Sequence, residues 1–442
     1  MKRILLVLAA MAAFLLSGSQ PVSAANQRYI VRTSGGLSNV LRFCGSANCQ
    51  VQGALDGVIG HTYLVTSSNN LLAELLNPVL NLLESLLGIE SVEPDTLLSI
   101  PVVPQQSGAS ALSDTAPVIY YGTLVWHGYV AQQAAQIINL QGAQLSFQVS
   151  GIGIVADIDT GVDPTHPALM PVLLPGYDFT RNQPGASEWL DVSGATSSGI
   201  PSTGSQDAQP VVVQQSTAAV LDQSTAAVLD GGPYSDFGHG TMTAGLIHLA
   251  APTAKILPLK AFSANGTGYL SNIIAALYYA AQNNANVVNM SFDLTTSSTA
   301  LSAAISYANQ SGVVLVASAG NGSTSARVYP ASLSPNVMGI ASTSDSDTLS
   351  SFSNYGNADV WIAAPGENVM STYPGGTYAS SSGTSFSCPL VTGSVALLMD
   401  ARSGVTQSNA AASLAHAQPL TASVNHGRLD VYQAVLSWLS SQ

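Results

Sequence analysis

The sequence VSGIGIVADIDTG, residues 149–161, decides the fold, because it joins an apolar strand to an Asp-Thr-Gly turn. We expect the strand over Val149–Ile158. Three more short apolar runs follow, and the segments between them are rich in Ala, with helical composition over Ser271–Gln282. These runs are Lys255–Lys260, Asn286–Met290 and Val313–Ala317. Apolar strands alternating with helices predict an α/β fold with a parallel β-sheet flanked by helices on both faces.

A smaller region with a different pattern precedes this domain. Residues 26–100 contain strand-like runs at Tyr29–Arg32 and Thr62–Val65, and a Leu-rich helical stretch over Leu71–Leu87. Mixed strands and helices over this length predict a small α+β domain. Residues 101–117 are rich in Pro, Ser and Gln and predict an exposed linker, so the larger domain is expected over residues 118–442.

One segment interrupts the larger domain. Residues 191–236 are rich in Ser, Gly, Gln and Pro, and they contain two identical copies of one sequence, Gln215–Asp222 and Gln223–Asp230. Two copies are too few for a solenoid. The segment therefore predicts a low-complexity surface insertion.

The N-terminus has the pattern of a secretory signal. Met1-Lys2-Arg3 is positively charged, Ile4–Leu16 is apolar, and Val22-Ser23-Ala24 is a small-x-small cleavage pattern. A membrane anchor needs about 20 apolar residues, more than this run provides. We expect residues 1–24 to be a signal peptide and the protein to be secreted and extracellular, with no membrane attachment after removal of the signal.

The charge balance excludes one class of partner. The chain has 442 residues with 24 acidic and 11 basic side chains, a formal net charge of −13. Binding to phosphate groups requires a basic surface. Nucleic acids and anionic membrane surfaces are therefore not expected as partners.

The cysteines are too few for a disulfide framework. There are three, of which Cys44 and Cys49 are close enough in sequence to pair. Cys388 is expected to be a packed core thiol.

Four local motifs carry groups suited to catalysis. They are Asp159-Thr160-Gly161, His239-Gly240-Thr241, Ala319-Gly320-Asn321 and the stretch Gly383–Pro389, GTSFSCP, at the start of a helix. Taken singly, the first three are ordinary turn or loop sequences, and Ser385 is an ordinary helix cap. Taken together, they supply a hydroxyl nucleophile, a base, a carboxylate to orient the base and a donor for an oxyanion.

In this order, the four motifs resemble those of the subtilisin-like serine proteases, and the resemblance covers residues 26 to about 437. It implies that Ser385 attacks the scissile carbonyl of a polypeptide substrate, while His239 takes the serine proton and returns it to the leaving amine. Asp159 would hold the imidazole. Asn321, with the backbone N–H of Ser385, would form the oxyanion hole.

The resemblance also implies substrate contacts. Gly268 matches an edge strand that pairs with an extended substrate, and Ser318, Ala319 and Gly320 match one wall of the pocket. Ser291 begins the stretch that matches the other wall, Ser291-Phe292-Asp293-Leu294, where the family usually has two glycines. The Tyr329–Pro330 bond resembles one that is cis in the family.

The chemistry implied by the resemblance needs no cofactor. Structural calcium is common in the family, but no loop here has convincing ligand spacing, and no metal ligands are assigned. Asp345-Ser346-Asp347 is interpreted as a solvated turn.

Residues 26–100 resemble the family's propeptide. Such a segment helps the catalytic domain to fold, inhibits it intramolecularly and is removed by self-cleavage, here expected after Ile100. A permanently attached small domain is the alternative interpretation.

Three other functions are compatible with parts of the sequence. A catalytically silent binding or scaffold protein on this fold would lack a triad member, and none is missing. A lipase-like α/β-hydrolase would have Gly-x-Ser-x-Gly, but Ser387 stands in place of the second glycine. The sedolisin relatives share a run like Ser382–Ser385 but use Glu where this chain has His239.

Asp157 is an unusual residue two positions before Asp159. Side chains two apart on a strand share a face, so the two carboxyl groups are expected to interact. If both ionise, they raise the pKa of His239, and if Asp157 is protonated they do not. From the acidic composition we predict activity that extends below neutral pH.

Overall fold

The computed structural model describes residues 27–68, 88–100, 110–192, 211–214, 217–219, 234–356, 359–420 and 424–441. The predicted signal peptide, the predicted helix over Leu71–Leu87 and nearly all of the tandem repeat lie outside these residues. The described chain divides into two compact units. One contains residues up to 53 together with 63–94, and the other contains residues 54–62 and 95–442.

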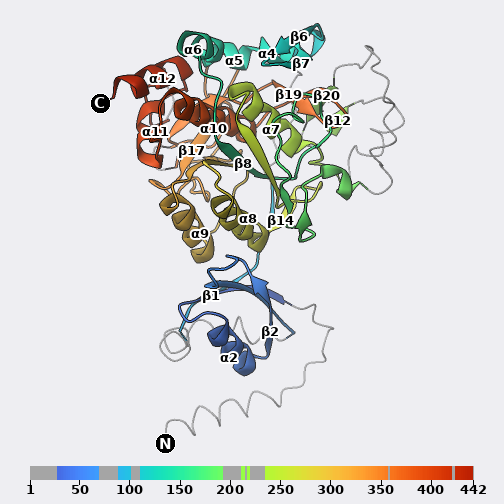
Figure 1. Cartoon of the computed structure of the whole chain (residues 1–442), viewed down its shortest axis with the longest axis vertical. Coiled ribbons are helices and arrows are strands. Elements are labelled where there is room, and N and C mark those ends of the chain that lie inside the picture. The colour runs from blue at the N-terminus through green and yellow to red at the C-terminus, as the bar shows by residue number, and fades with distance from the viewer. Residues whose placement is uncertain are drawn as a thin grey trace, which may run out of the picture. The chain divides into compact units, whose positions relative to one another are not determined.

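The second unit is built on an eight-stranded sheet with the order β10-β9-β13-β8-β15-β16-β17-β18. Among the described strands of this sheet, all neighbours pair in parallel except β10 and β9, which are antiparallel. Helices cover both faces (Figure 1), with α7 and α10 packed together on one and α8 and α9 on the other. The predicted α/β fold is confirmed. The strands are β8 (Ile154–Asp159), β9 (Tyr177–Asp178), β10 (Gln183–Pro184), β13 (Lys255–Lys260), β15 (Val287–Met290), β16 (Val314–Ser318), β17 (Met338–Thr343) and β18 (Ile362–Pro365), and the helices are α7 (His239–Ala250), α8 (Leu270–Gln282), α9 (Thr299–Gln310) and α10 (Thr384–Ala401).

The sheet is buried on both faces, which explains its continuous apolar strands. Every residue of β15, β16, β17 and β18 is buried. Helix α10 is buried over most of its length and passes through the core, and Pro389 is accommodated in its early turns. Cys388 is a buried free thiol, as expected.

Smaller elements complete this unit. A second sheet has the order β12-β11-β20-β19, and β14 pairs with β5. These strands are β5 (Leu97–Ser99), β11 (Val211–Gln214), β12 (Thr217–Ala219), β14 (Thr267–Tyr269), β19 (Val369–Tyr373) and β20 (Thr377–Ser381). The remaining elements are β6 (Pro117–Tyr120), β7 (Thr123–Trp126), α4 (His127–Val130), α5 (Gln133–Ile137), α6 (Leu140–Phe147), α11 (Gln407–Leu414), α12 (Val431–Ser440) and the 3₁₀ helices η1 (Ser110–Ser113) and η2 (Glu188–Asp191).

The first unit is a four-stranded sheet, β2-β3-β1-β4, with one described helix. Its strands are β1 (Gln27–Thr33), β2 (Cys49–Ala54), β3 (Thr62–Ser67) and β4 (Ile89–Pro94), and α2 covers Leu37–Ala47. Tyr29, Val31, Phe43 and Val65 belong to its own apolar core. Cys44 and Cys49 form a disulfide.

Three predicted boundaries need correction. The strand of the opening stretch begins at Ile154 instead of Val149, because Gly151 and Gly153 have positive φ and keep the backbone out of the extended region. The insertion begins later than residue 191, since Asp191 is buried in an ion pair, and β11 of the insertion pairs with β20. The end of the predicted linker is folded, with Leu112 buried in η1.

The compact first unit ends at Pro94, before the predicted boundary at residue 100. The Asp95 carboxylate accepts hydrogen bonds from the backbone N–H and the hydroxyl of Ser271, each at 2.8 Å. Leu98 pairs with Gly268 in the antiparallel ladder of β5 and β14. Residues 95–100 therefore belong to the second unit.

We expect the second unit to lose stability in acid through His248. Burial in α7, followed by the nearby His166, lowers the pKa of His248 to about 4. Because an unfolded chain has a histidine pKa near ~6.5, it binds a proton first as the pH falls. Stability is thus intact above pH ~6.5 and declines down to pH 4, by up to about 3 kcal/mol.

Denaturant unfolding of a Ser385→Ala parent at pH 7 and pH 4.5 measures this loss. His248→Gln should reduce the difference between the two pH values. The exposed His416 gives a matched control, and His416→Gln should leave the difference as in the parent. If the free energy of unfolding falls equally between pH 7 and pH 4.5 in the parent and in His248→Gln, a group other than His248 causes the acid sensitivity.

Candidate active site

The three residues of the predicted triad stand at the ends of three elements. Asp159 is the last residue of β8, His239 is the first of α7, and Ser385 is the second of α10. All three are buried. The carboxyl end of a parallel strand and the N-termini of two helices thus contribute one residue each.

Close backbone contact explains the glycines in two of the motifs. A Cβ on Gly240 would lie 2.0 Å from the carbonyl oxygen of Gly161. Gly161 itself has φ +104°, and its own Cβ would lie 2.4 Å from the Ala186 carbonyl oxygen. Only glycine lets the first turn of α7 touch the turn after β8, which brings His239 to Asp159.

Asp159 and His239 form a hydrogen-bonded pair. His239 Nδ1 lies 2.7 Å from Asp159 Oδ1, which also accepts the Thr160 N–H at 2.7 Å. The other ring nitrogen, Nε2, is buried without a hydrogen-bond partner among the described residues. Burial lowers the pKa of His239, but the charge and hydrogen bond of Asp159 outweigh it, and with Asp236 and Asp157 they raise this pKa to about 8.

Ser385 lies beside this pair. The ring of Phe386, the next residue, is 5.4 Å from the His239 ring between centroids. The Ser385 hydroxyl donates to the Ser291 carbonyl at 3.3 Å. The Ser385 hydroxyl is thus hydrogen-bonded to a backbone carbonyl and not to His239, although the residue that follows Ser385 lies against the imidazole.

Thr384 fixes the orientation of the Asn321 amide. Both the N–H and the hydroxyl of Thr384 donate to Asn321 Oδ1 at 2.9 Å. Since the oxygen end is held by Thr384, the NH₂ end of the amide is the one turned the other way. Asn321 is thus tied directly to the residue before Ser385.

The residues predicted to bind substrate fall into two groups. Gly268 lies in β14, opposite Leu98 of β5. Ser318 ends β16, and Ala319 and Gly320 follow it, all of them buried. Ser291 is buried too, and its hydroxyl donates to the Ser385 carbonyl at 2.9 Å, so its side chain supports the nucleophile segment.

A carboxyl group occupies the place where glycines were expected. Asp293 Oδ2 lies 2.2 Å from the position that a Cβ on Gly320 would take. Burial raises the pKa of Asp293 to about 6. The two stretches that resemble the pocket walls are thus adjacent, with an acidic side chain between them.

Asp157 and Asp159 interact through one hydroxyl, as the shared strand face predicted. Thr243 Oγ1 lies 2.8 Å from Asp157 Oδ2, 3.4 Å from Asp159 Oδ2 and 3.0 Å from the Gly240 carbonyl oxygen. A threonine hydroxyl has a single proton for these three acceptors. Burial first, and then the Asp159 charge, raise the pKa of Asp157 to about 8, so a proton on Asp157 fits this geometry.

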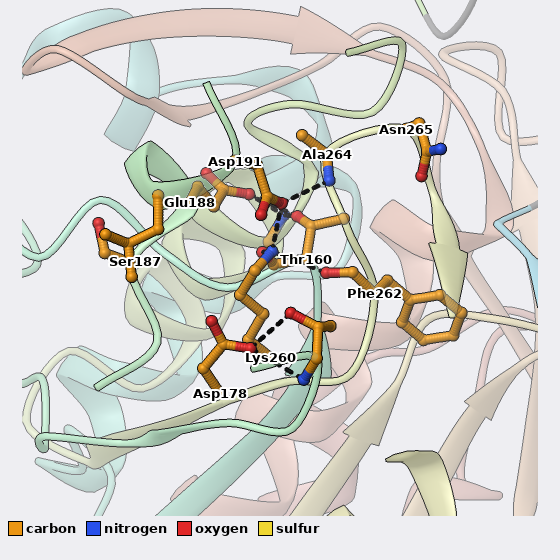
Figure 2. A network of polar contacts seen from close by, with 12 residues as sticks. Thr160, Asp178, Ser187, Glu188, Asp191, Lys260, Phe262, Ala264 and Asn265 are labelled. Carbon is orange, nitrogen blue, oxygen red and sulfur yellow. Dashed lines mark hydrogen bonds and ion pairs between the residues drawn. The ribbon is translucent and has the colours of Figure 1, made fainter. Parts of the chain in front are cut away.

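A buried polar network adjoins the pair and was not identified from the sequence (Figure 2). The Lys260 ammonium is fully buried and donates to Asp191 Oδ2 at 2.6 Å and to the carbonyls of Thr160 and Phe262. Asp191 Oδ2 also accepts the Ala264 N–H at 2.6 Å. No local sequence pattern indicates that Lys260 or Asp191 is buried, because each charge is buried only by pairing with the other, which is distant in sequence.

The described residues offer no group of three or more His, Cys, Asp or Glu side chains arranged to hold a metal ion. Asp347, from the predicted solvated turn, binds the Arg428 guanidinium through both oxygens, at 2.9 and 2.8 Å. The Tyr329–Pro330 peptide is cis, as expected, and so is Ser334–Pro335.

Among the described helices, none is both long enough and apolar enough to cross a membrane.

Comparison with known proteins identifies relatives. The model of the subtilase family matches residues 152–432. A thermophilic serine proteinase of Bacillus sp. (strain AK1) is 36% identical over 244 residues, which cover 55% of this chain and 51% of the relative. Thermitase of Thermoactinomyces vulgaris is 32% identical over 295 residues, 64% of this chain and 88% of thermitase. The chain thus spans about half the length of the first relative and most of the second.

A solved structure extends the likeness in fold. The crystal structure of fervidolysin from Fervidobacterium pennivorans, a keratinolytic enzyme related to subtilisin, matches 96% of this chain and 63% of its own with a TM-score of 0.69 and 22% identity. At this identity the likeness shows the fold alone. The family match over residues 152–432 and the thermitase match over 88% of that protein establish that this chain belongs to the subtilase family.

Proposed function

We propose that this chain is a secreted serine endopeptidase, made as a self-processing zymogen, that hydrolyses polypeptides through an acyl-enzyme. The observation that carries the proposal is the 2.7 Å contact of His239 Nδ1 with Asp159, in the same buried site as Ser385. In this mechanism His239 Nε2 takes the Ser385 proton and returns it to the leaving amine, and Asp159 stabilises the imidazolium. Family membership supports the reaction class.

The oxyanion is assigned to two donors. The Ser385 N–H lies in the first turn of α10, where backbone N–H groups and the helix dipole favour negative charge. The Asn321 amide supplies the second donor, and its oxygen is held by Thr384. Such preorganised donors stabilise the tetrahedral intermediate because they need no reorientation during the reaction.

Residues 95–100 support the zymogen part of the proposal. Leu97–Ser99 pairs antiparallel with Thr267–Tyr269, and the Ile100 N–H donates to the Gly266 carbonyl at 2.9 Å. An extended segment on the strand that contains Gly268 occupies the place assigned to substrate, so it inhibits until cleavage after Ile100. Residues 1–24 provide the signal for export, and no cofactor takes part in the chemistry.

Covalent labelling tests the proposed nucleophile. Phenylmethylsulfonyl fluoride should inactivate the processed enzyme with one equivalent bound, and peptide mapping should place the label on Ser385. The neighbouring Ser387 provides the control, since Ser387→Ala should still be labelled. Hydrolysis of casein that resists the reagent, or a label on another residue, would contradict the proposal.

The pH dependence of peptide hydrolysis follows from the titration of His239, the general base of the proposed mechanism. His239 accepts a proton only when it is neutral, and its pKa is raised to about 8. We expect kcat/KM to rise as the pH passes through 8, which runs against the activity below neutral pH predicted from composition. Asp157→Asn should leave this rise nearly in place, because the pKa of Asp157 is itself raised to about 8, so this carboxyl group is mostly protonated below that pH and contributes least to the raised pKa of His239. Profiles from pH 5 to 10 with a peptide nitroanilide that has no titrating groups in this range decide both points. A rise centred below pH 7 in the wild type would refute the expected pH dependence, and a rise that moves by about one pH unit or more in Asp157→Asn would show that Asp157 is ionised there.

A further inference from the structure

Glu188 is a fully buried carboxyl group beside the two segments that carry Asp159 and His239. Its backbone N–H donates to the Val162 carbonyl at 3.1 Å, and the Val162 N–H donates to Ala186 at 2.8 Å. These two hydrogen bonds hold the start of η2 against Val162, which follows the Asp159-Thr160-Gly161 turn. Figure 2 shows the side chain beside Thr160. Glu188 itself is not part of any of the four sequence motifs.

The Glu188 side chain bonds to both segments. Thr160, next to Asp159, donates its hydroxyl to Glu188 Oε1. From the first turn of α7, the Thr241 hydroxyl donates to Oε2 at 2.6 Å and the Gly240 N–H lies 3.2 Å from Oε1. One carboxyl group thus spans the neighbours of two triad residues.

The hydrogen bonds of these two hydroxyls favour an ionised carboxylate at Glu188. The Thr160 oxygen already accepts the Gly240 N–H at 2.9 Å, and the Thr241 oxygen accepts the Asp163 N–H at 2.8 Å. Glu188 is the acceptor that lies beside the single proton of each hydroxyl, so an ionised Glu188 accepts both hydrogen bonds. A protonated Glu or a Gln at position 188 has only one oxygen that accepts well. The hydroxyl of Thr160 or of Thr241 would then point its proton at an O–H or N–H donor.

We propose that Glu188 is a positioning residue, which as a carboxylate fixes the Asp159 turn against the first turn of α7 and so sets the Asp159–His239 geometry. The inference rests on the proposed peptidase function and deepens it. Glu188 touches no reacting atom, so its effect passes through the orientation of the catalytic pair. Small misplacements of such a pair reduce rates strongly, by about a hundredfold for 1 Å.

Two charged groups act on Glu188 from neighbouring strands. Burial raises the pKa of Glu188 to about 7; the Thr160 and Thr241 hydroxyls and the Lys260 charge on β13 lower it, and the Asp159 charge on β8 raises it. The carboxylate form therefore prevails above pH 7 and is lost below it. Since His239 must lose a proton as well, the acid side of the activity profile should involve two protons.

Glu188→Gln is the test, because it keeps the shape of the side chain and removes one acceptor. We expect kcat to fall by about tenfold to a hundredfold with KM within about twofold. Below pH 7 the slope of log kcat/KM against pH should be about 2 in the wild type and about 1 in the variant. In a Ser385→Ala background, the low-field proton resonance of the His239–Asp159 hydrogen bond should shift on Glu188→Gln.

Asp178→Asn is the matched control. Asp178 is a buried carboxyl group that accepts from Thr180 and Arg181, and its printed hydrogen bonds include none to the triad residues or to their neighbours. This variant should lose stability but keep the wild-type kcat and slope. If Glu188→Gln does not fold, Thr241→Val removes the donor to Oε2 and should give the same kcat loss and resonance shift.

Two results would overturn the inference. One is a Glu188→Gln enzyme with wild-type kcat and slope, and the other is a His239–Asp159 resonance that the substitution leaves in place. A wild type without peptidase activity would contradict the proposed function instead, and the resonance would still decide the role of Glu188.

Discussion

Ser385→Ala is expected to abolish peptide hydrolysis and to leave residues 26–100 attached to the secreted chain. The substitution removes the oxygen that attacks the carbonyl, and no neighbouring group replaces it, since the Ser291 hydroxyl is held by the Ser385 carbonyl. The loss in kcat should be about a millionfold, a magnitude known from the triad of subtilisin itself and not one that the present geometry yields. Casein hydrolysis across pH 5 to 10 and intact mass measure the two effects.

The neighbouring serine provides the control for this result. Ser387 is also buried on the first turns of α10. Ser387→Ala should still hydrolyse casein and should still lose mass through cleavage beyond Ile100. If Ser385→Ala processed itself, self-cleavage would have to be abandoned in favour of another protease. If it hydrolysed casein, the proposed nucleophile would be wrong.

Asp191→Ala is expected to cause the largest loss of stability. It removes the carboxylate 2.6 Å from Lys260 Nζ, and both side chains are almost entirely buried. An ammonium left buried without its counter-ion costs about 3–5 kcal/mol of unfolding free energy. Asp191 also pairs with Arg181 and accepts the Ala264 N–H, which adds to the loss.

Denaturant unfolding in the Ser385→Ala background, which avoids self-digestion, measures this loss. Adding Lys260→Met should recover part of it, because the unpaired charge disappears. Asp114, in an exposed pair with His127, gives the control, and Asp114→Asn should leave the unfolding midpoint nearly unchanged. A change below about 1 kcal/mol for Asp191→Ala would mean that Lys260 finds enough compensation in the carbonyls of Thr160 and Phe262.

The sequence by itself determined three strands of the central sheet and the order of the motifs. Lys255–Lys260 is a strand with the predicted bounds, Asn286–Met290 begins one residue before β15, and Val313–Ala317 is β16 displaced by one residue at each end. Such runs are legible because a strand buried on both faces is apolar along its whole length. The Asp-Thr-Gly and His-Gly-Thr motifs can be recognised in the sequence because Gly161 and Gly240 lie in backbone contact, where any other residue would place a Cβ too close to a carbonyl oxygen.

Only the tertiary structure decided what surrounds the triad. Glu188 and Asp191 lie in a stretch without periodicity, and their partners Thr241 and Lys260 are separated from them by the whole insertion. Asp157 was noticed in the sequence, but the form it takes depends on burial and on the hydroxyl of Thr243. Hydrogen-bond direction and desolvation arise only when distant segments pack together, so the state of a buried carboxyl group is a property of the fold and not of its local sequence.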